Sequence, residues 1–474
     1  MAPAVWQQTI AAFEPHHELL TSLAQAFAAH DVALYLVGGS VRDALLGRKL
    51  VDLDFTTVAR PQLIQEILEG WAQVVWDTGI AFGTVSAEYN GEQVEITTFR
   101  SDVYDGNSRN PQVQFGDTLE HDLQRRDFRM NAMALAVSPT GDVLFCDPLK
   151  GLADMQAKVI DTPSLPEVSF HDDPLRMLRA TRFMSQLSFS MAPRVSQALE
   201  NMAGEIQRIT AERVQAELDK LLLGANPLLG IDSMVRSGLA SYILPEVVAL
   251  DEMNRDRRRH KDVYVHSLQV LEKAIALEEE PDLILRWAAL LHDIGKPDTR
   301  KYNAAGKVSF YHHDAVGAKL ARNRLRALKY SKQSVRDISQ LIYLHMRVYG
   351  FSDGEWTDSA VRRYVTDAGE LLPRLQLLVR ADCTTQNPKK AARLQGAIDF
   401  LDERIAALAA AEDLARVRPA LNGNEIMELL GLQPGPEVGD AWAYLKEQRL
   451  ERGPMEREEA IELLQQWWAQ QHSA

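Results

Sequence analysis

The chain of 474 residues contains little cysteine, few aromatic side chains and no excess of positive charge. Two cysteines, Cys146 and Cys383, cannot build a disulfide framework, and such sparse usage is typical of a reducing cytoplasm. No apolar run reaches the roughly 20 residues that span a bilayer. The first residues also lack a basic region followed by an apolar core, so we expect no signal peptide. We therefore expect a cytoplasmic protein with no membrane partner.

The net charge of −14 argues against a protein whose whole surface coats nucleic acid, because neutralising phosphates requires a basic surface. Two basic clusters stand out against this acidic background. Each is equally consistent with an RNA backbone contact and with a solvated helix face. The first comprises Arg255, Arg257, Arg258, Arg259 and Lys261, and the second comprises Lys319, Arg322, Arg324, Arg326, Lys329 and Lys332.

Hydrophobic periodicity predicts an α+β head followed by helices only. An amphipathic helix in the first 30 residues precedes several short strand signals, which indicate a mixed or antiparallel sheet between about 31 and 150. Beyond residue 150 the apolar residues recur with helical spacing. We expect a catalytic head (1–150), a helical neck and body (151–250), a helical metal domain (251–400) and a helical tail (401–474).

The most informative segment pairs a glycine turn with two carboxylates. A short strand ends at Gly38 and Gly39, a helix that begins near Ser40 carries Arg42, and Asp52 and Asp54 follow on the next strand. Residues two apart on a strand point to the same face, so these carboxylates repel each other unless a cation binds between them. Mg²⁺ held by carboxylates and substrate phosphates meets that need. The glycines allow close approach of a triphosphate at the helix N-terminus, within reach of Arg42.

These residues resemble the class II tRNA nucleotidyltransferase (CCA-adding enzyme) and poly(A) polymerase family. GGSVRD followed by DLD is similar to its first motif, and three further motifs follow in the family's order. They are Arg125-Arg126-Asp127-Phe128 with Asn131-Ala132, Asp172-Asp173-Pro174-Leu175-Arg176, and Glu212-Arg213-Val214 with Glu217-Leu218. The resemblance implies a polymerase-β-like head, with Asp52 and Asp54 as catalytic, Mg²⁺-binding residues. It also implies CTP, ATP and the tRNA 3′ end as partners.

The resemblance further implies that Asp173 and Arg176 act as an amino-acid template. Cytosine and adenine both present an amino donor beside a ring-nitrogen acceptor, so a carboxylate and a guanidinium together can accept both bases and reject guanine and uracil. Arg179 and Arg182 are expected to extend a positive wall toward the nucleotide, and Arg126 to contact it. Asp172 replaces the family's usual glutamate. Glu95 is either a third acidic group near the metal or an ordinary exposed strand residue.

A second set of residues resembles the metal site of the HD phosphohydrolase superfamily. His266, His292, Asp293 and Asp382 match its four positions, each on or beside an otherwise apolar helix. Several metal-ligating side chains that each interrupt an apolar helix indicate that these side chains meet at a divalent metal. His345, with either His312 or His313, is a candidate for binding a second ion. Cyclic phosphates or small phosphoesters are the candidate substrates.

The sequence therefore predicts a CCA-adding tRNA nucleotidyltransferase with an HD-type phosphohydrolase domain and no obligate protein partner. Poly(A) polymerase and a CC-only enzyme are the alternatives within the family, and an HD signalling phosphohydrolase with an inactive head is the alternative outside it. The segment Ser101–Phe115, with Gly106 as a pivot, is similar to a loop that full CCA-adding enzymes retain.

Overall fold

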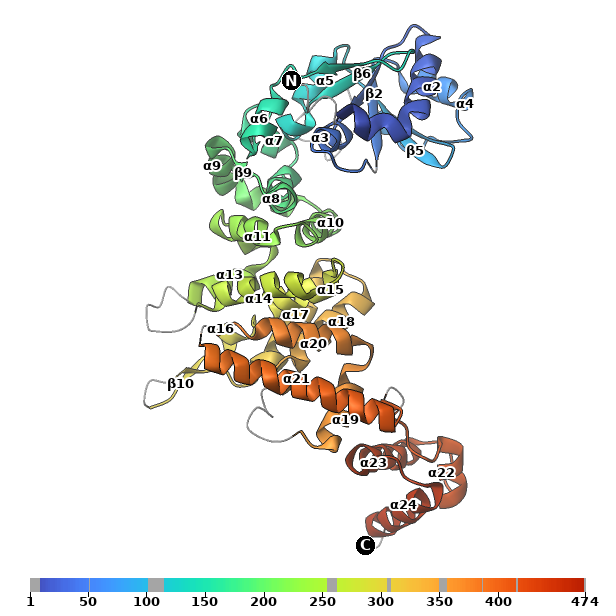
Figure 1. The fold of residues 1–474 in the computed structure, drawn as a ribbon, viewed down its shortest axis with the longest axis vertical. Helices are drawn as coiled ribbons and strands as arrows, with labels where there is room; N and C mark the ends of the chain where they lie inside the picture. Colours follow the sequence, from blue (N-terminus) through green and yellow to red (C-terminus); the bar gives the residue numbers. More distant parts are fainter. Residues whose placement is uncertain are drawn as a thin grey trace. The chain divides into compact units, whose positions relative to one another are not determined.

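The computed structural model describes residues 9–50, 52–100, 115–253, 262–304, 308–348, 356–385, 387–414 and 417–472 (Figure 1). The chain divides into two compact units, Met1–Ile243 and Leu244–Ala474. The predicted basic cluster at 255–261 and nearly all of the predicted loop at 101–115 lie outside the described residues. The four-part division of the chain remains a prediction.

The N-terminal unit is built on a mixed sheet of seven strands, the order of which is β3-β4-β5-β2-β1-β6-β7. Its strands are β1 (Leu34–Val37), β2 (Leu53–Thr57), β3 (Val74–Trp76), β4 (Thr84–Tyr89), β5 (Glu92–Thr98), β6 (Ala134–Val137) and β7 (Val143–Cys146). Only β2 and β5 pair in parallel, and the other neighbours are antiparallel. The predicted mixed or antiparallel sheet is thus confirmed, with β2 at its centre.

Helices cover this sheet and then continue alone through the rest of the unit. They are α2 (His17–Ala28), α3 (Gly39–Leu45), α4 (Pro61–Glu69), α5 (Leu119–Gln124), α6 (Gly151–Ala157), α7 (Pro166–Asp172), α8 (Leu175–Leu187), α9 (Pro193–Met202), α10 (Ala211–Leu222), α11 (Pro227–Arg236) and α12 (Ala240–Ile243). A two-stranded sheet of β8 (Val159–Ile160) and β9 (Ser190–Met191) lies among them.

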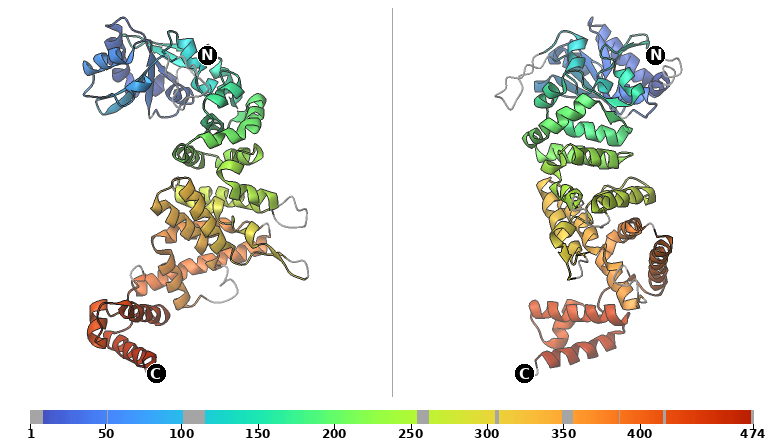
Figure 2. Two further views of the ribbon diagram at one scale, coloured as in Figure 1. Left: turned by 180° about the vertical axis from the view of Figure 1, so that it is seen from behind. Right: turned by 90° about the vertical axis from the view of Figure 1, so that its left-hand side faces the viewer.

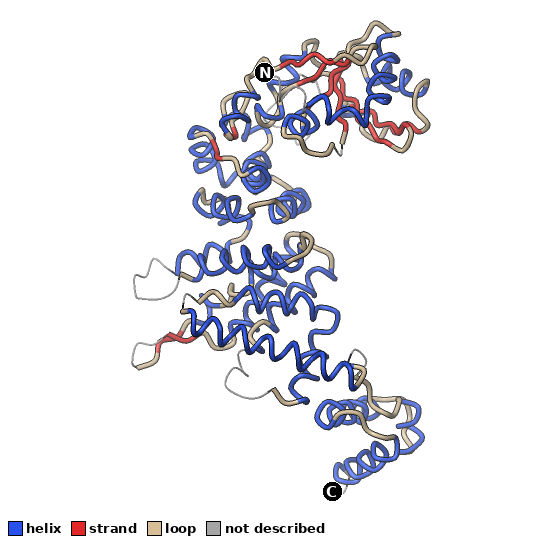
Figure 3. The backbone as a smooth tube through the Cα atoms, viewed as in Figure 1, coloured by secondary structure: helices blue, strands red, loops and turns tan. Residues whose placement is uncertain are grey.

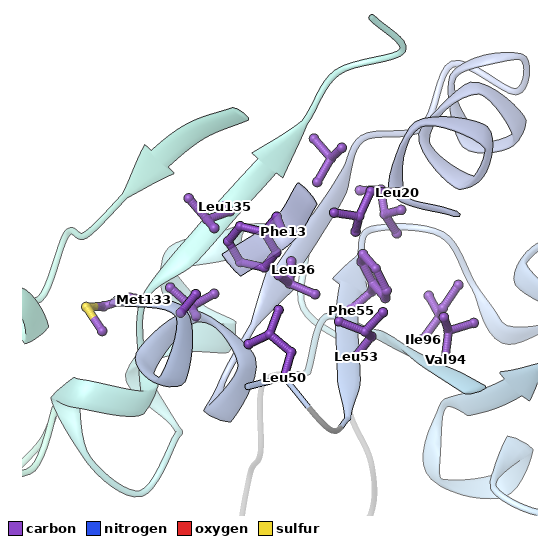
Figure 4. Packing of buried hydrophobic residues seen from close by; sticks show 14 of the residues in the cluster. Phe13, Leu20, Leu36, Leu50, Leu53, Phe55, Val94, Ile96, Met133 and Leu135 are labelled. Carbon is purple, nitrogen blue, oxygen red and sulfur yellow. The ribbon is translucent and has the colours of Figure 1, made fainter. Parts of the chain in front are cut away.

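The core of the head explains why apolar and polar residues alternate at the start of β2. Figure 4 shows Leu53 and Phe55 of β2 packed among Leu36, Val94 and Ile96 from the adjoining strands. The apolar face of α2 joins the same cluster through Leu19, Leu20, Leu23 and Phe27, as its helical spacing predicted. Because alternate residues of β2 enter this core, the residues between them face the opposite side of the sheet.

The C-terminal unit is helical apart from the hairpin of β10 (Lys301–Tyr302) and β11 (Val308–Ser309), as Figure 3 shows. Its helices are α13 (Pro245–Glu252), α14 (Val263–Leu277), α15 (Leu283–Leu291), α16 (Lys296–Thr299), α17 (His313–Ala327), α18 (Lys332–Leu344), α19 (Asp358–Ala368), α20 (Leu372–Asp382), α21 (Pro388–Ala411), α22 (Gly423–Leu430), α23 (Pro436–Arg452) and α24 (Arg457–Gln471). The last three pack around a small apolar cluster of their own (Figure 2). No helix in the described part of the chain is both long and apolar enough to cross a membrane.

Two local predictions differ from the structure. The sequence favours Ser40 as the N-cap of the first short helix of the head, whereas α3 begins at Gly39, because Gly38 turns the backbone with a φ of 76°. Ser40 therefore lies inside α3, and its hydroxyl donates to the carbonyl oxygen of Asp52 at 2.7 Å. Gly306 in the sequence also predicts a loop from Asn303 to Phe310, whereas the structure has β11 (Val308–Ser309) within that segment.

Candidate functional site

The two predicted catalytic aspartates lie at the start of the central strand. Asp52 precedes β2 and is exposed, whereas Asp54 lies within the strand and is partly buried. The parallel pairing of β2 with β5 puts Glu95 directly beside Asp54, so the third acidic group considered from the sequence belongs to this site. Burial, the Glu95 carboxylate and Asp52 outweigh the attraction of Arg126 and raise the pKa of Asp54 to about 6. A cation would relieve this repulsion.

The glycine turn lies against the same carboxylate. A Cβ at Gly38 would lie 3.3 Å from Arg126 Nη1 and 3.8 Å from Asp54 Oδ2, in addition to requiring a positive φ. The turn, the acid and the arginine are therefore in mutual contact range. Arg42, which was expected to reach a phosphate, instead donates to Asp43 and, at 2.7 Å, to Asn131 Oδ1.

An arginine-rich cavity of about 400 Å³ opens beside Asp54. A single buried carboxylate, Asp122, accepts hydrogen bonds from both Arg125 and Arg126 and so fixes one wall. The cavity is lined by Val37, Asp54, Phe55, Thr84, Thr97, Arg100, Arg125, Arg126, Asp127, Asp173, Leu175, Arg176, Arg179 and Arg213. Its concentration of guanidinium groups suits a polyanionic ligand.

The predicted template pair lines this cavity, with Asp173 between α7 and α8 and Arg176 in the first turn of α8. Asp173 Oδ1 accepts the Leu175 amide at 3.2 Å, as a helix cap would, and Asp173 Oδ2 accepts from Arg213 Nη2 at 2.9 Å. Arg176 donates to the Ser169 hydroxyl at 2.8 Å and to the Arg125 carbonyl oxygen at 2.7 Å. Both template side chains are thus held by residues of two other motifs, Arg125 and Arg213, and by Ser169.

Fewer arginines of α8 line the cavity than the sequence suggested. Arg179 lines the cavity but binds Asp127 at 2.5 Å and Glu217 at 3.4 Å. Burial would raise the pKa of Asp127, yet the Arg179 guanidinium and Asn131 hold it below its usual value. Arg182 does not line the cavity, since its side chain is buried beside Phe183 and paired with Glu217 at 3.0 Å. Direct nucleotide contact by Arg182 therefore stays a prediction, and in this structure its guanidinium is engaged by Glu217.

The predicted metal residues of the C-terminal unit converge from α14, α17 and α20 and from the C-terminal ends of α15 and α18. Two groups of three residues could each hold a metal ion, because the donor atoms within a group lie within 4.8 Å of one another. The first group is His266, His292 and Asp382, and the second is Asp293, His313 and His345. The Nε2 atoms of His266 and His292 are 3.3 Å apart, and the His266 Nε2 atom is 3.0 Å from Asp382 Oδ1. His312 is exposed at the start of α17, so His313 is the member of that pair inside the cluster.

Hydrogen bonding at Nδ1 orients the four rings of this cluster. His292, His313 and His345 bond through Nδ1 to the carbonyl oxygens of residues 289, 310 and 342, at 2.6–2.8 Å. His266 Nδ1 bonds to the Thr384 hydroxyl at 2.8 Å. Each ring is thereby left with Nε2 directed to the interior, which is the arrangement of metal-ligating imidazoles.

Charge within the cluster also favours a cation. Burial and the nearby His292 lower the pKa of His345 to about 4, so this imidazole stays neutral. The Nε2 atom of His345 has no hydrogen-bond partner among the described residues. Despite burial, His292 and Lys296 hold the pKa of Asp293 far below its usual value. The Lys296 ammonium lies 2.5 Å from Asp293 Oδ2. The residues present therefore fit one or two divalent ions.

Three family profiles match the chain in series. "Poly A polymerase head domain" matches residues 34–161, "Probable RNA and SrmB- binding site of polymerase A" matches 188–250, and "HD domain" matches 263–386. These boundaries follow the order of the motifs found in the sequence.

Similar proteins extend over almost the whole chain. The A-adding tRNA nucleotidyltransferase of Deinococcus radiodurans is 33% identical, over 91% of this chain and 95% of its own length. The CC-adding tRNA nucleotidyltransferase of Thermus thermophilus is 30% identical, over 91% and 93%. The crystal structure of the Bacillus stearothermophilus CCA-adding enzyme in complex with CTP matches with a TM-score of 0.67 at 26% identity, over 100% of both chains.

Proposed function

Because this chain belongs to the tRNA nucleotidyltransferase family, we propose that it adds C, C and A to the 3′ end of tRNA from CTP and ATP without a nucleic-acid template. The 3′ hydroxyl of the tRNA attacks the α-phosphate of the incoming nucleotide, and pyrophosphate leaves. The observation that carries this proposal is the position of the template pair Asp173 and Arg176 in the same arginine-lined cavity as Asp54.

The carboxylates at the start of β2 are proposed to hold Mg²⁺. Asp52 and Asp54 supply two oxygen ligands and leave positions for substrate phosphates, in keeping with the few protein ligands that Mg²⁺ usually takes. When bound, Mg²⁺ lowers the pKa of an attacking hydroxyl and stabilises charge on the leaving oxygen. Arg126, held by Asp122, places a fixed positive charge beside the phosphates, and Gly38 keeps the backbone open to them.

Base selection is assigned to Asp173 and Arg176. The carboxylate accepts from the amino group that cytosine and adenine share, and the guanidinium donates to their ring nitrogen. Arg213 occupies Asp173 Oδ2 in this structure, and Oδ1 accepts from the Leu175 amide, so a base must share or replace one of these donors. Arg179 and Arg182 support the site indirectly, since they hold the carboxylates of Asp127 and Glu217 and do not contact the base.

Extension of an unfinished tRNA tests the assignment. The chain, given tRNA that ends before CCA together with CTP, ATP and Mg²⁺, is expected to add two C residues and one A and then stop. Asp52→Ala or Asp54→Ala should abolish both additions, whereas Asp77→Ala, which changes an exposed aspartate after β3, should not. Long A tails, addition of C alone or addition of A alone would instead identify a poly(A), CC-adding or A-adding enzyme.

Removal of the template arginine tests base choice separately from catalysis. Arg176→Ala should lose discrimination of CTP and ATP against UTP and GTP while the triphosphate still binds through Arg126. A variant that keeps wild-type rates and selectivity would contradict the template role.

A second activity, a metal-dependent phosphohydrolase, is favoured by the four inward-facing Nε2 atoms of the histidine cluster. His266, His292, Asp293 and Asp382 are proposed to hold one divalent ion, and His313 and His345 to complete the site for a second. Metal analysis of protein purified without chelator, with a 2′,3′-cyclic phosphate hydrolysis assay, tests this activity. The double variant His292→Ala, Asp293→Ala should lose metal and hydrolysis but keep CCA addition. Wild-type protein without metal or turnover would leave the cluster a structural polar core.

A further inference from the structure

The exposed side of α17 carries a stripe of basic residues. Lys319, Arg322 and Arg326 follow one another at intervals of three and four residues, and Lys329 continues this spacing just beyond the helix. Such spacing keeps side chains on one face of a helix. All four are exposed, while Gly317, Ala318, Ala321 and Leu325 form the buried side. The stripe is defined here as Lys319, Arg322, Arg326 and Lys329.

The positive charge of the stripe is not neutralised by nearby acids. Residues 315–336 contain seven lysines and arginines and no aspartate or glutamate, in a chain whose net charge is −14. None of the four stripe residues has an ion pair within the described ranges. Arg324 differs because it turns toward α13 and donates to both oxygens of Glu246 at 2.9–3.1 Å.

The arrangement is unfavourable for folding. Like charges three and four residues apart on a helix repel each other, and an alternating pattern with acids would stabilise α17. Lys329 adds backbone strain, because it has a φ of 66° at the position after the helix where glycine is preferred. The amide of Tyr330 closes the turn onto the Leu325 carbonyl oxygen at 3.0 Å, which fixes Lys329 in that conformation. Lys329 thus combines a strained backbone with an exposed charge that is unpaired in the part of the chain that the structure describes, and a ligand for the stripe would give that charge a partner.

We propose that this stripe binds the phosphate backbone of the RNA substrate, an inference that rests on the proposed function for the identity of that RNA. Long, unpaired cationic side chains suit a polyanion whose charges repeat along a line. The exposed residues beside and between them are small or polar, such as Ala315, Asn323 and Ala327. They offer neither the aromatic anchors of a protein interface nor the apolar residues that insert into a membrane. The stripe also lies outside the segment 188–250, which the RNA-binding profile matches.

Two variants separate RNA binding from folding. Arg322→Gln with Arg326→Gln should weaken the binding of unfinished tRNA roughly tenfold or more near 0.1 M salt, and lower the slope of log K against log salt by about two. Lys329→Gly should weaken tRNA binding a few-fold while raising the melting temperature, because glycine relieves the positive φ. If the stripe served only to stabilise the fold, Lys329→Gly could not weaken tRNA binding and raise the melting temperature at the same time. The matched control is Arg452→Gln with Arg457→Gln, whose guanidinium groups already pair with Glu459 and Glu425.

Binding and extension are measured on the same preparations of the full chain. The expected result is weaker binding and a higher KM for tRNA in both stripe variants, an unchanged kcat at saturating tRNA, and wild-type behaviour in the control. Wild-type affinity and salt slope in the stripe variants would overturn the proposal, and so would an equal loss in the control. Wild-type protein that binds tRNA through the stripe but does not extend it would overturn the proposed function alone.

Discussion

Asp54 allows the electrostatics of the catalytic strand to be tested without an activity assay. Its pKa is raised from the usual 3.8 to about 6, first by burial and then by Glu95 and Asp52. A carboxyl that is easier to protonate in the folded state stabilises the fold at low pH, and this contribution is lost as the pH rises through about 6. At pH 8, therefore, the ionised Asp54 destabilises the metal-free protein.

The size of the effect follows from that pKa. A change from 3.8 to about 6 corresponds to about 3 kcal/mol of unfavourable free energy when Asp54 is fully ionised. Asn has nearly the same shape and no charge, so Asp54→Asn should regain much of this energy. For a unit of this size the melting transition should rise by roughly 5–10 °C at pH 8 in EDTA, and by less at pH 5.

Scanning calorimetry of the metal-free protein at both pH values provides the measurement. Asp52→Asn is the matched control, and it should change the melting temperature little because Asp52 is exposed. Mg²⁺ with CTP should raise the transition of the wild type and not that of Asp54→Asn. If Asp54→Asn melts at or below the wild-type temperature at pH 8 in EDTA, the carboxylates of this strand do not repel each other as described.

Three further predictions concern packing, the buried ion pairs and the second metal site. Gly151→Ala should lower the free energy of unfolding by roughly 1–3 kcal/mol in a denaturant titration, because its Cβ would lie 2.1 Å from the Arg129 carbonyl oxygen. Glu217→Gln should cost about 3 kcal/mol by leaving buried Arg182 without its carboxylate, and a change below 1 kcal/mol would contradict that pairing. His345→Ala should lower the divalent metal content by one ion per chain while CCA addition continues; unchanged metal content would remove His345 from the ligand set.

Much of the fold was predictable because the apolar pattern is regular where the core forms. Leu53 and Phe55 alternate with Asp54, and this alone placed the acids on the face away from the core. The pairing of Asp54 with Glu95 was not predictable, because a parallel register depends on a crossover between distant strands. β3 and β6 were not predicted, and β3 is only three residues long, too short for a periodic signal.

Residue types indicated both sites, but the contacts that position their side chains came only from the structure. The histidines and aspartates of the second site were recognisable by their order, whereas the role of Thr384 on His266 required the fold. Likewise Arg176 matched a motif, but its hydrogen bonds to the Ser169 hydroxyl and to the carbonyl group of Arg125, which belongs to another motif, required the fold. Arg182 was expected to face the nucleotide, whereas its side chain is buried beside Glu217, a contact that depends on how the helices pack.

The central place of β2 has a consequence for amide hydrogen exchange. With β5 on one side and β1 on the other, this strand can lose its hydrogen bonds only if the sheet itself opens. Its amides should exchange near the rate set by unfolding of the whole unit, whereas those of the edge strands β3 and β7 should exchange through local fraying. The carboxylates proposed to hold Mg²⁺ thus begin the segment that opens last, so fluctuations that loosen the sheet edges leave their spacing unchanged.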